Sequence, residues 1–182
     1  SLIGDYQSEN ATTAILAARE LRGFGVNLTE EGVYTGVSRV KWPGRCQLMQ
    51  REPWIFLDGA INQTTAKAVV DLVKKLPAKR ITAVVGIHTP DDLQGVCSEI
   101  SKIADKLILT EVHSTGLPWD REALLARASR YFKNVIFLAD IQKAFSFAIK
   151  DVPKDGGILL LGHQSFVGAA LTFWNVDTGR LW

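Results

Sequence analysis

Four short apolar runs constrain the fold of this chain more than any other feature. They are ITAVVG at 81–86, LILT at 107–110, VIFLA at 135–139 and ILLLG at 158–162. Each run is continuously apolar, whereas a strand with one face in water alternates apolar and polar residues. Helical stretches are expected between them at 91–104, 119–132 and 140–150. These are of roughly the length that a parallel crossover needs. The pattern predicts a parallel sheet with helices on both faces.

A different arrangement opens this region. The runs CQLMQR at 46–51 and WIFLD at 54–58 are joined by a tight Arg-Glu-Pro turn. Such a short connection predicts an antiparallel hairpin on one edge of the sheet. Further helices are expected at 62–76 and from Ser165 onward. The predicted fold class is therefore α/β, with an open, mostly parallel sheet.

The first 41 residues follow another pattern. SENATTAILAARELRG at 8–23 is Ala-rich and amphipathic, with Ser8 as a possible N-cap and Gly23 as a stop. A second short helix is expected from Thr29, where a Thr-x-Glu pattern favours a helix start. The Pro43-Gly44 pair then breaks the pattern. We therefore expect a helical segment at 1–41 and an α/β domain at 42–182.

Composition excludes several classes of protein. A hydrophobic content of 47% with 22% charged residues is ordinary for a soluble globular chain. The net charge is only +2, and no Lys/Arg run exceeds the pairs near 74–80, so no nucleic-acid partner is expected. No stretch approaches the roughly 18 apolar residues of a membrane span. Residues 1–20 also lack the pattern of a secretory signal. No membrane partner is expected.

The two cysteines, Cys46 and Cys97, are too few and too far apart for a disulfide framework or a usual zinc site. A reducing cytoplasm is the expected location.

A ligand site is expected beyond the carboxyl ends of the predicted strands, where open α/β sheets bind their ligands. The polar residues at these ends include Asp58, His88, Glu111, Asp140 and His163. The sequence has no G-x-x-x-x-G-K-[ST] phosphate loop, no G-x-G-x-x-G fingerprint and no G-x-S-x-G elbow. We therefore expect ligand contacts but no catalytic residue within this chain.

Four segments together resemble a known family. GDYQSENATTAILAARELR, WPGRCQ, DGAINQTTAKAV and LLGHQSFVGAAL occur in this order and at these separations. They are similar to the C-terminal part of folylpolyglutamate synthase/dihydrofolate synthase, a branch of the Mur ligase superfamily, and the likeness covers essentially the whole chain. The resemblance implies that residues 1–41 are the helical tail of a central ATP-binding domain plus a linker. Residues 42–182 would be the Rossmann-like C-terminal domain.

The resemblance also implies a chemistry. Enzymes of this family activate a folate carboxylate with ATP as an acyl phosphate, which the amine of glutamate then attacks. Asn10 is implied to contact the adenine end of ATP, Arg45 the phosphates or ribose, and Asp58 the ribose hydroxyls. A guanidinium offers forked donors to phosphate, and a strand-end carboxylate is a natural ribose acceptor. Mg²⁺ would have its ligands in an N-terminal part, within the central ATPase domain that is the implied protein partner.

Glutamate and folate or pteroate are the other implied small-molecule partners. The family His after D-G-A is Ile61 in this chain, the next residue is Asn62, and a late family Ser is His163. These three positions are implied to lie around glutamate. Isoleucine has no donor, so His163 is the candidate that replaces the lost one.

Each candidate also has a purely structural interpretation. Asn10 can be an exposed helix residue, Arg45 a solvated linker charge, and Asp58 the N-cap of helix 62–76. His163 can be a surface or capped histidine, and His88 and His113 are expected in loops. Two functions stay open: part of an ATP-dependent amide ligase, or a degenerate Rossmann-like module that binds a nucleotide or partner without catalysis. The sequence also does not distinguish dihydrofolate synthase specificity from folylpolyglutamate synthase specificity.

Overall fold

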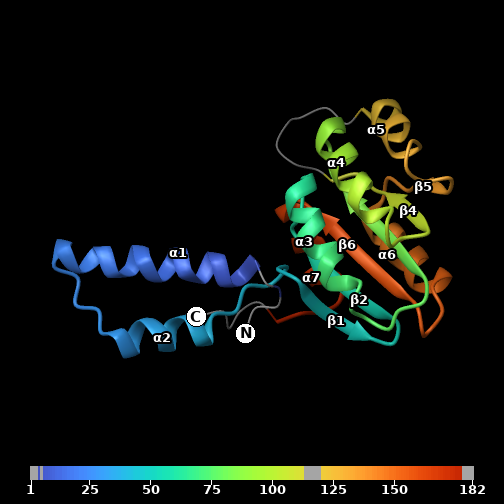
Figure 1. Cartoon of the computed structure of the whole chain (residues 1–182). Helices are drawn as coiled ribbons and strands as arrows, with labels where there is room; N and C mark the ends of the chain where they lie inside the picture. The colour runs from blue at the N-terminus through green and yellow to red at the C-terminus, as the bar shows by residue number, and fades with distance from the viewer. Residues whose placement is uncertain (1–3, 5, 113–119, 178–182) are drawn as a thin grey trace.

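One six-stranded sheet organises the α/β part of the molecule (Figure 1). The computed structural model describes residues 4, 6–112 and 120–177. The strands are β1 (Gln47–Arg51), β2 (Trp54–Asp58), β3 (Ile81–Gly86), β4 (Lys106–Leu109), β5 (Val135–Phe137) and β6 (Gly157–Gly162). Their order across the sheet is β1-β2-β6-β3-β4-β5. All neighbours are parallel except β1 and β2, which pair antiparallel, so the predicted edge hairpin is confirmed.

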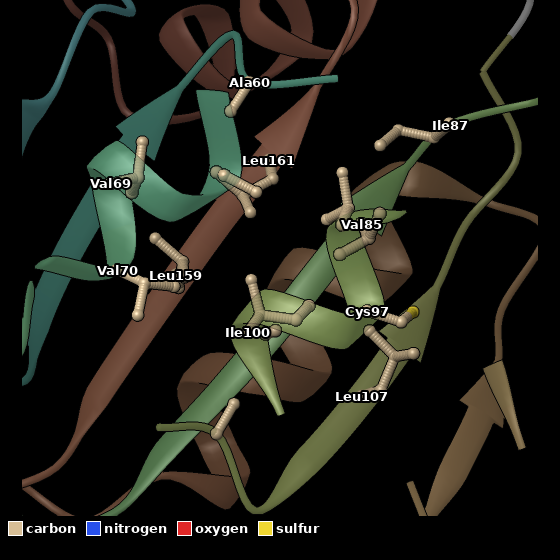
Figure 2. Close-up of a cluster of buried hydrophobic side chains, with 14 of the residues drawn as sticks. Ala60, Val69, Val70, Val85, Ile87, Cys97, Ile100, Leu107, Leu159 and Leu161 are labelled. Carbon is tan, nitrogen blue, oxygen red and sulfur yellow. The ribbon is translucent and has the colours of Figure 1, made fainter. Parts of the chain in front are cut away.

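Helices cover both faces of this sheet, as the continuous apolar runs predicted. One face carries α3 (Gln63–Val73), α4 (Pro90–Ile100) and α5 (Arg121–Ala128), and the other carries α6 (Ile141–Asp151) and α7 (Gln164–Phe173). Alternate residues of β6 serve the two cores. Leu159 and Leu161 pack under α3 and α4 (Figure 2), whereas Ile158 and Leu160 pack under α6 and α7. Every residue of β3 and β6 is buried, which explains why neither strand alternates in sequence.

The boundaries of these elements lie within a few residues of those expected. The start of the helix predicted at 119–132 lies outside the described residues, and α5 is shorter than that prediction at its C-terminal end. The first helix differs more. Helix α1 spans Tyr6–Glu20, so Ser8 lies inside it and is not its N-cap. The stop expected at Gly23 was also wrong, because a 3₁₀ turn η1 (Leu21–Phe24) continues the helix to Gly25.

Gly25 adopts the left-handed conformation (φ 83°) that closes the end of a helix, and its N–H donates to the Arg22 carbonyl. The second helix, α2 (Glu30–Arg39), begins as predicted, with the Thr29 hydroxyl accepting from the Gly32 N–H. Helices α1 and α2 lie side by side and project away from the sheet (Figure 1). Arg19 and Arg22 both pair with Glu30 across this helical hairpin. Among the described residues of the two helices, Val33 alone is buried.

Candidate functional site

The topology singles out one point at the carboxyl edge of the sheet. Strands β3 and β6 are parallel neighbours, with Gly86 opposite Gly162 at their ends. The helix after β3 is α4, on one face, and the helix after β6 is α7, on the other. Open α/β sheets bind ligands where consecutive connections diverge in this way. Strand β2, which ends at Asp58, lies on the other side of β6.

Asp58 is a buried carboxylate that helps to fix the turn before β1. Its side chain is 4% exposed, and its Oδ2 accepts from the Cys46 N–H at 2.7 Å. Burial raises the pKa of Asp58 above its usual value, while the Cys46 N–H and the positive charge of Arg45 act in the opposite direction. The carboxylate is therefore held in one place by a backbone donor.

Arg45 lies directly over the backbone that follows Asp58. A Cβ placed on Gly59 would come within 2.0 Å of the Arg45 Nη1 atom. The Gly59 N–H donates to the Gly44 carbonyl at 2.9 Å, and the Gly44 N–H donates to the Gln47 side chain at 2.8 Å. The Trp-Pro-Gly-Arg turn is thus joined to the end of β2. The structure places the two residues that the sequence paired, Arg45 and Asp58, at the same corner.

Tyr6 also reaches this corner, and the sequence analysis did not single it out. Its hydroxyl lies 3.1 Å from Cys46 Sγ and donates to Asp58 Oδ2 at 3.4 Å. Burial, the contact with Cys46 and the charge of Asp58 raise the pKa of Tyr6 above its ordinary value, so the phenol stays protonated. Burial likewise raises the pKa of the Cys46 thiol to about 12. The segment GDYQSEN contained the signal, but starting the helix at Ser8 left Tyr6 outside it.

The three residues implied to lie around glutamate are placed differently from one another. Asn62 is the N-cap of α3, where its Oδ1 accepts from the Thr65 N–H at 3.0 Å in a capping box. The alternative interpretation of Asp58 as the N-cap of this helix is therefore wrong, because Asn62 holds that position and the carboxylate of Asp58 accepts from the Cys46 N–H. Ile61 is partly buried and packs against the core under α3 and α4. A branched apolar side chain at this position is accommodated by the protein interior.

His163 follows β6 directly and occupies the N-cap position of α7. Its Nδ1 lies 3.4 Å from the Gly86 carbonyl, and its ring stacks on that of His88 with centroids 4.4 Å apart. His88 was expected only as a loop residue, so this pair was missed. His113, which was also expected in a loop, lies outside the described residues.

Asn10 is the candidate nearest the start of the chain. It is exposed on α1, and its side-chain amide donates to the Gln7 side chain at 3.4 Å. It stands four positions after Tyr6, so the two share one side of the helix. Asn10 therefore lies one turn beyond the residue that touches Asp58.

Within the described part of the chain, no group of three or more His, Cys, Asp or Glu side chains is placed to hold a metal ion. No helix in that part is long and apolar enough to cross a membrane. What the strand ends do offer is a buried carboxylate beside a guanidinium, and a histidine pair at the divergence of two helices.

The fold defines a Rossmann-like domain, a class whose members bind ligands beyond the carboxyl ends of their strands. The family model of the Mur ligase glutamate ligase domain matches residues 44–164. The chain belongs to the Mur ligase family through this domain.

Individual relatives agree with that family. The dihydrofolate synthase/folylpolyglutamate synthase of Bacillus subtilis is 32% identical over 106 residues, covering 57% of this chain and 25% of the relative. The Mycobacterium tuberculosis protein of the same name is 25% identical over 194 residues, covering 97% and 40%. The structure of M. tuberculosis folylpolyglutamate synthase complexed with ADP matches with a TM-score of 0.79 and 26% identity, covering 97% and 41%. The chain thus spans less than half the length of these relatives.

Proposed function

We propose that this chain is the C-terminal part of an ATP-dependent ligase that adds glutamate to a folate or dihydropteroate. In this proposal residues 1–41 are the tail of a central ATP-binding domain plus a linker. Residues 42–182 are the domain that closes over the nucleotide. The family membership and the ADP-bound relative support the ligase class. Both cysteines are buried free thiols, which suits work in a reducing cytoplasm.

The corner formed by Arg45 and Asp58 carries the proposal. A guanidinium held over Gly59 presents forked donors to a phosphate or ribose. Asp58 accepts from ribose hydroxyls while its Oδ2 stays bound to the Cys46 N–H. Because a backbone hydrogen bond already orients this carboxylate, little conformational entropy is lost when the ribose arrives. Asn10 contacts the adenine from the exposed side of α1.

Glutamate lies closer to the middle of the sheet in this proposal, near Ile61, Asn62 and His163. His163 supplies the donor that Ile61 lacks, and Asn62 contributes atoms not used in capping α3. Mg²⁺ is held by residues of the upstream part, and it offsets the charge of the ATP phosphates when bound. The task of this chain is to bind and orient the nucleotide and the amino acid, and to exclude water on closure.

Activity of the full-length protein that contains this chain tests the proposal. With MgATP, glutamate and dihydropteroate or a folate, we expect ADP release and a product heavier by one glutamate. Arg45→Ala should lower kcat/KM for ATP by about tenfold to a hundredfold, the range for a hydrogen bond to a charged group. The matched control is Arg80→Ala, an exposed arginine before β3 at the opposite edge of the sheet, which should leave activity unchanged.

The 182-residue chain alone should neither hydrolyse ATP nor ligate glutamate, because it has no phosphate loop. ADP release by this chain that Arg45→Ala abolishes would contradict this. A full-length protein that binds ATP but ligates nothing would instead identify a non-catalytic nucleotide-binding module.

A further inference from the structure

His88 is a histidine that neither the family motifs nor the proposed function uses, although it lies at the divergence of α4 and α7. It follows β3 by two positions, and His163 follows β6 by one. Glycines at both strand ends permit their approach. A Cβ on Gly162 would lie 2.7 Å from the Gly86 carbonyl, and a Cβ on Gly86 would lie 2.4 Å from Phe166. Larger residues here would push the two strand ends, and the histidines after them, apart.

The two rings form one unit. Their planes are inclined by 29° with centroids 4.4 Å apart, which is a stacked arrangement. His163 Nδ1 lies against the Gly86 carbonyl, so the backbone at the end of β3 also contacts this ring. Removing His88 would leave one face of the His163 imidazole without its packing neighbour. His88 is thus placed to set the orientation of His163.

One ring nitrogen of His88 lacks, within the described part of the chain, the hydrogen bond that a buried polar atom normally makes. Its Nδ1 is buried, and among the described residues it has no hydrogen-bond partner. An unpaired buried polar atom costs on the order of the desolvation penalty of that group, and native structures seldom keep one without a reason. An acceptor or donor that arrives with a ligand would remove this cost.

The two helix starts beside the pair favour an anion, against the negative charges of Asp91 and Asp92 in the first turn of α4. Helices α4 and α7 begin here, and neither N-cap residue, Thr89 or His163, makes a side-chain cap bond. Thr89 donates its hydroxyl to Asp92 instead, at 2.6 Å. By contrast, α3, α5 and α6 are capped by side chains. Unsatisfied N–H groups at two helix starts add positive potential beside the rings.

The charge of the pair is limited by the closeness of its members. Burial, followed by the charge of His163, lowers the pKa of His88, and the carboxylate of Asp92 acts against both. Asp92, in the first turn of α4, acts on His88, whereas Asp91 of the same turn pairs with Arg127, and the first turn of α7 carries no charged residue. Two imidazolium ions stacked this closely repel each other, so protonation of one ring disfavours protonation of the other.

We propose that His88 is a positioning residue for His163, and that the stacked pair binds one carboxylate of the amino-acid substrate while sharing a single proton. The identity of that carboxylate rests on the proposed function, whereas the coupling of the two rings does not. An arriving anion favours the protonated pair, so binding takes up a proton. Binding therefore tightens as the pH falls from about 8 to about 6, the range in which imidazoles titrate.

The coupling is tested on the 182-residue chain by following the histidine ring signals in NMR titrations. His163→Phe keeps an aromatic ring in the stack and removes the charge of the imidazolium. In this variant the titration midpoint of His88 should rise, because the charge of His163 that lowers the pKa of His88 has gone. His113→Gln removes the third histidine signal and serves as the control. Equal His88 midpoints in the wild type and His163→Phe would overturn the proposal. His163→Gln repeats the test if circular dichroism shows that His163→Phe is unfolded.

The ligand is tested on the same chain and on the full-length protein. L-glutamate should shift both ring signals at lower concentration than inorganic phosphate does, and the reverse order would overturn the choice of a carboxylate.

In the full-length enzyme, His88→Ala should raise the glutamate KM about tenfold, as expected for one misplaced hydrogen bond, and His88→Phe should raise it less. The KM for ATP should stay unchanged. Equal effects on both substrates would contradict a role at the amino acid. If the full-length protein ligates nothing, the proposed function fails, and the NMR titration still decides the coupling.

Discussion

At the scale of single residues, two glycines decide where Arg45 lies. Gly59 leaves the space in which the guanidinium rests, since a Cβ there would meet Arg45 Nη1 at 2.0 Å. Gly44 has a positive φ of 75°, and a Cβ there would meet the Val167 Cγ1 at 2.2 Å. The first clash involves the far end of a flexible side chain, and the second involves a packed valine and a strained backbone. A substitution at Gly59 is therefore expected to change the site, whereas a substitution at Gly44 is expected to change the stability of the fold.

We expect Gly59→Ala to displace Arg45 at little cost in stability and to weaken ATP binding by the full-length protein about tenfold, as loss of a charge-assisted contact implies. Gly44→Ala should instead lower the free energy of unfolding by about 1 kcal/mol or more, because alanine is disfavoured at positive φ. Denaturant unfolding of the 182-residue chain and nucleotide binding by the full-length protein measure the two effects. A large loss of stability in Gly59→Ala would show that Arg45 cannot move aside.

At the scale of elements, the start of α3 illustrates how one residue serves a helix. Asn62 accepts from the Thr65 N–H, and the Thr65 hydroxyl accepts from the Asn62 N–H at 3.3 Å. This capping box fixes the point at which the chain turns from the end of β2 into the helix. Because β2 ends at Asp58, the cap also fixes the loop that carries Ile61. The element thus positions two of the residues proposed to lie around glutamate.

Asn62→Ala should destabilise the chain by about 1 kcal/mol, the usual cost of losing an N-cap. Thr64→Ala, an exposed residue in the same first helical turn, is the matched control and should change stability by less than about 0.5 kcal/mol. Urea unfolding followed by circular dichroism measures both. In the full-length protein, an Asn62→Ala variant with an unchanged KM for glutamate in the proposed reaction would restrict this residue to its structural role.

At the scale of the whole molecule, the helical hairpin and the α/β part differ in how well they are buried. The described large hydrophobic residues that remain exposed are concentrated between residues 16 and 42. They are Leu16, Leu21, Phe24, Val26, Tyr34, Val40 and Trp42, against Tyr131 and Phe147 elsewhere. Phe24 is 84% exposed. Exposed apolar side chains gathered on one part of a protein are typical of a surface that another protein surface covers. This agrees with the proposal that the hairpin packs on a central ATP-binding domain.

A 44–182 truncation should therefore fold cooperatively, because both cores of the sheet lie within it. It loses Tyr6, so its free energy of unfolding should fall modestly, by about the 0.5–1.5 kcal/mol of a hydrogen bond together with the packing of the ring. The 182-residue chain should self-associate more than the truncation, which sedimentation at several concentrations measures. An unfolded truncation beside a folded 182-residue chain would place the domain boundary elsewhere than the Pro-Gly turn.

Local sequence chemistry determined the class of fold and most of its elements. Continuous apolar runs such as 158–162 predicted buried parallel strands, and the short connection at 52–53 predicted the edge hairpin. Arg45 and Asp58 were brought together by the family resemblance, and the hairpin gives the physical reason, because its paired strands place the two positions close to each other. Helix ends were predicted less well. Ser8 and Gly23 are residue types that cap helices, but the helix begins at Tyr6 and the 3₁₀ turn after it ends at Gly25.

Tertiary structure alone decided the contacts that depend on strand order. Strand β6 inserts between β2 and β3, which brings His163 beside a strand end 77 positions earlier and allows it to stack on His88. Tyr6 meets Asp58 across 52 positions, because the start of α1 lies against the end of β2. Local patterns fix which segments become strands and helices, because periodicity and turn chemistry act over a few residues. They do not encode which distant segments become neighbours, because burial of the whole apolar surface selects that arrangement.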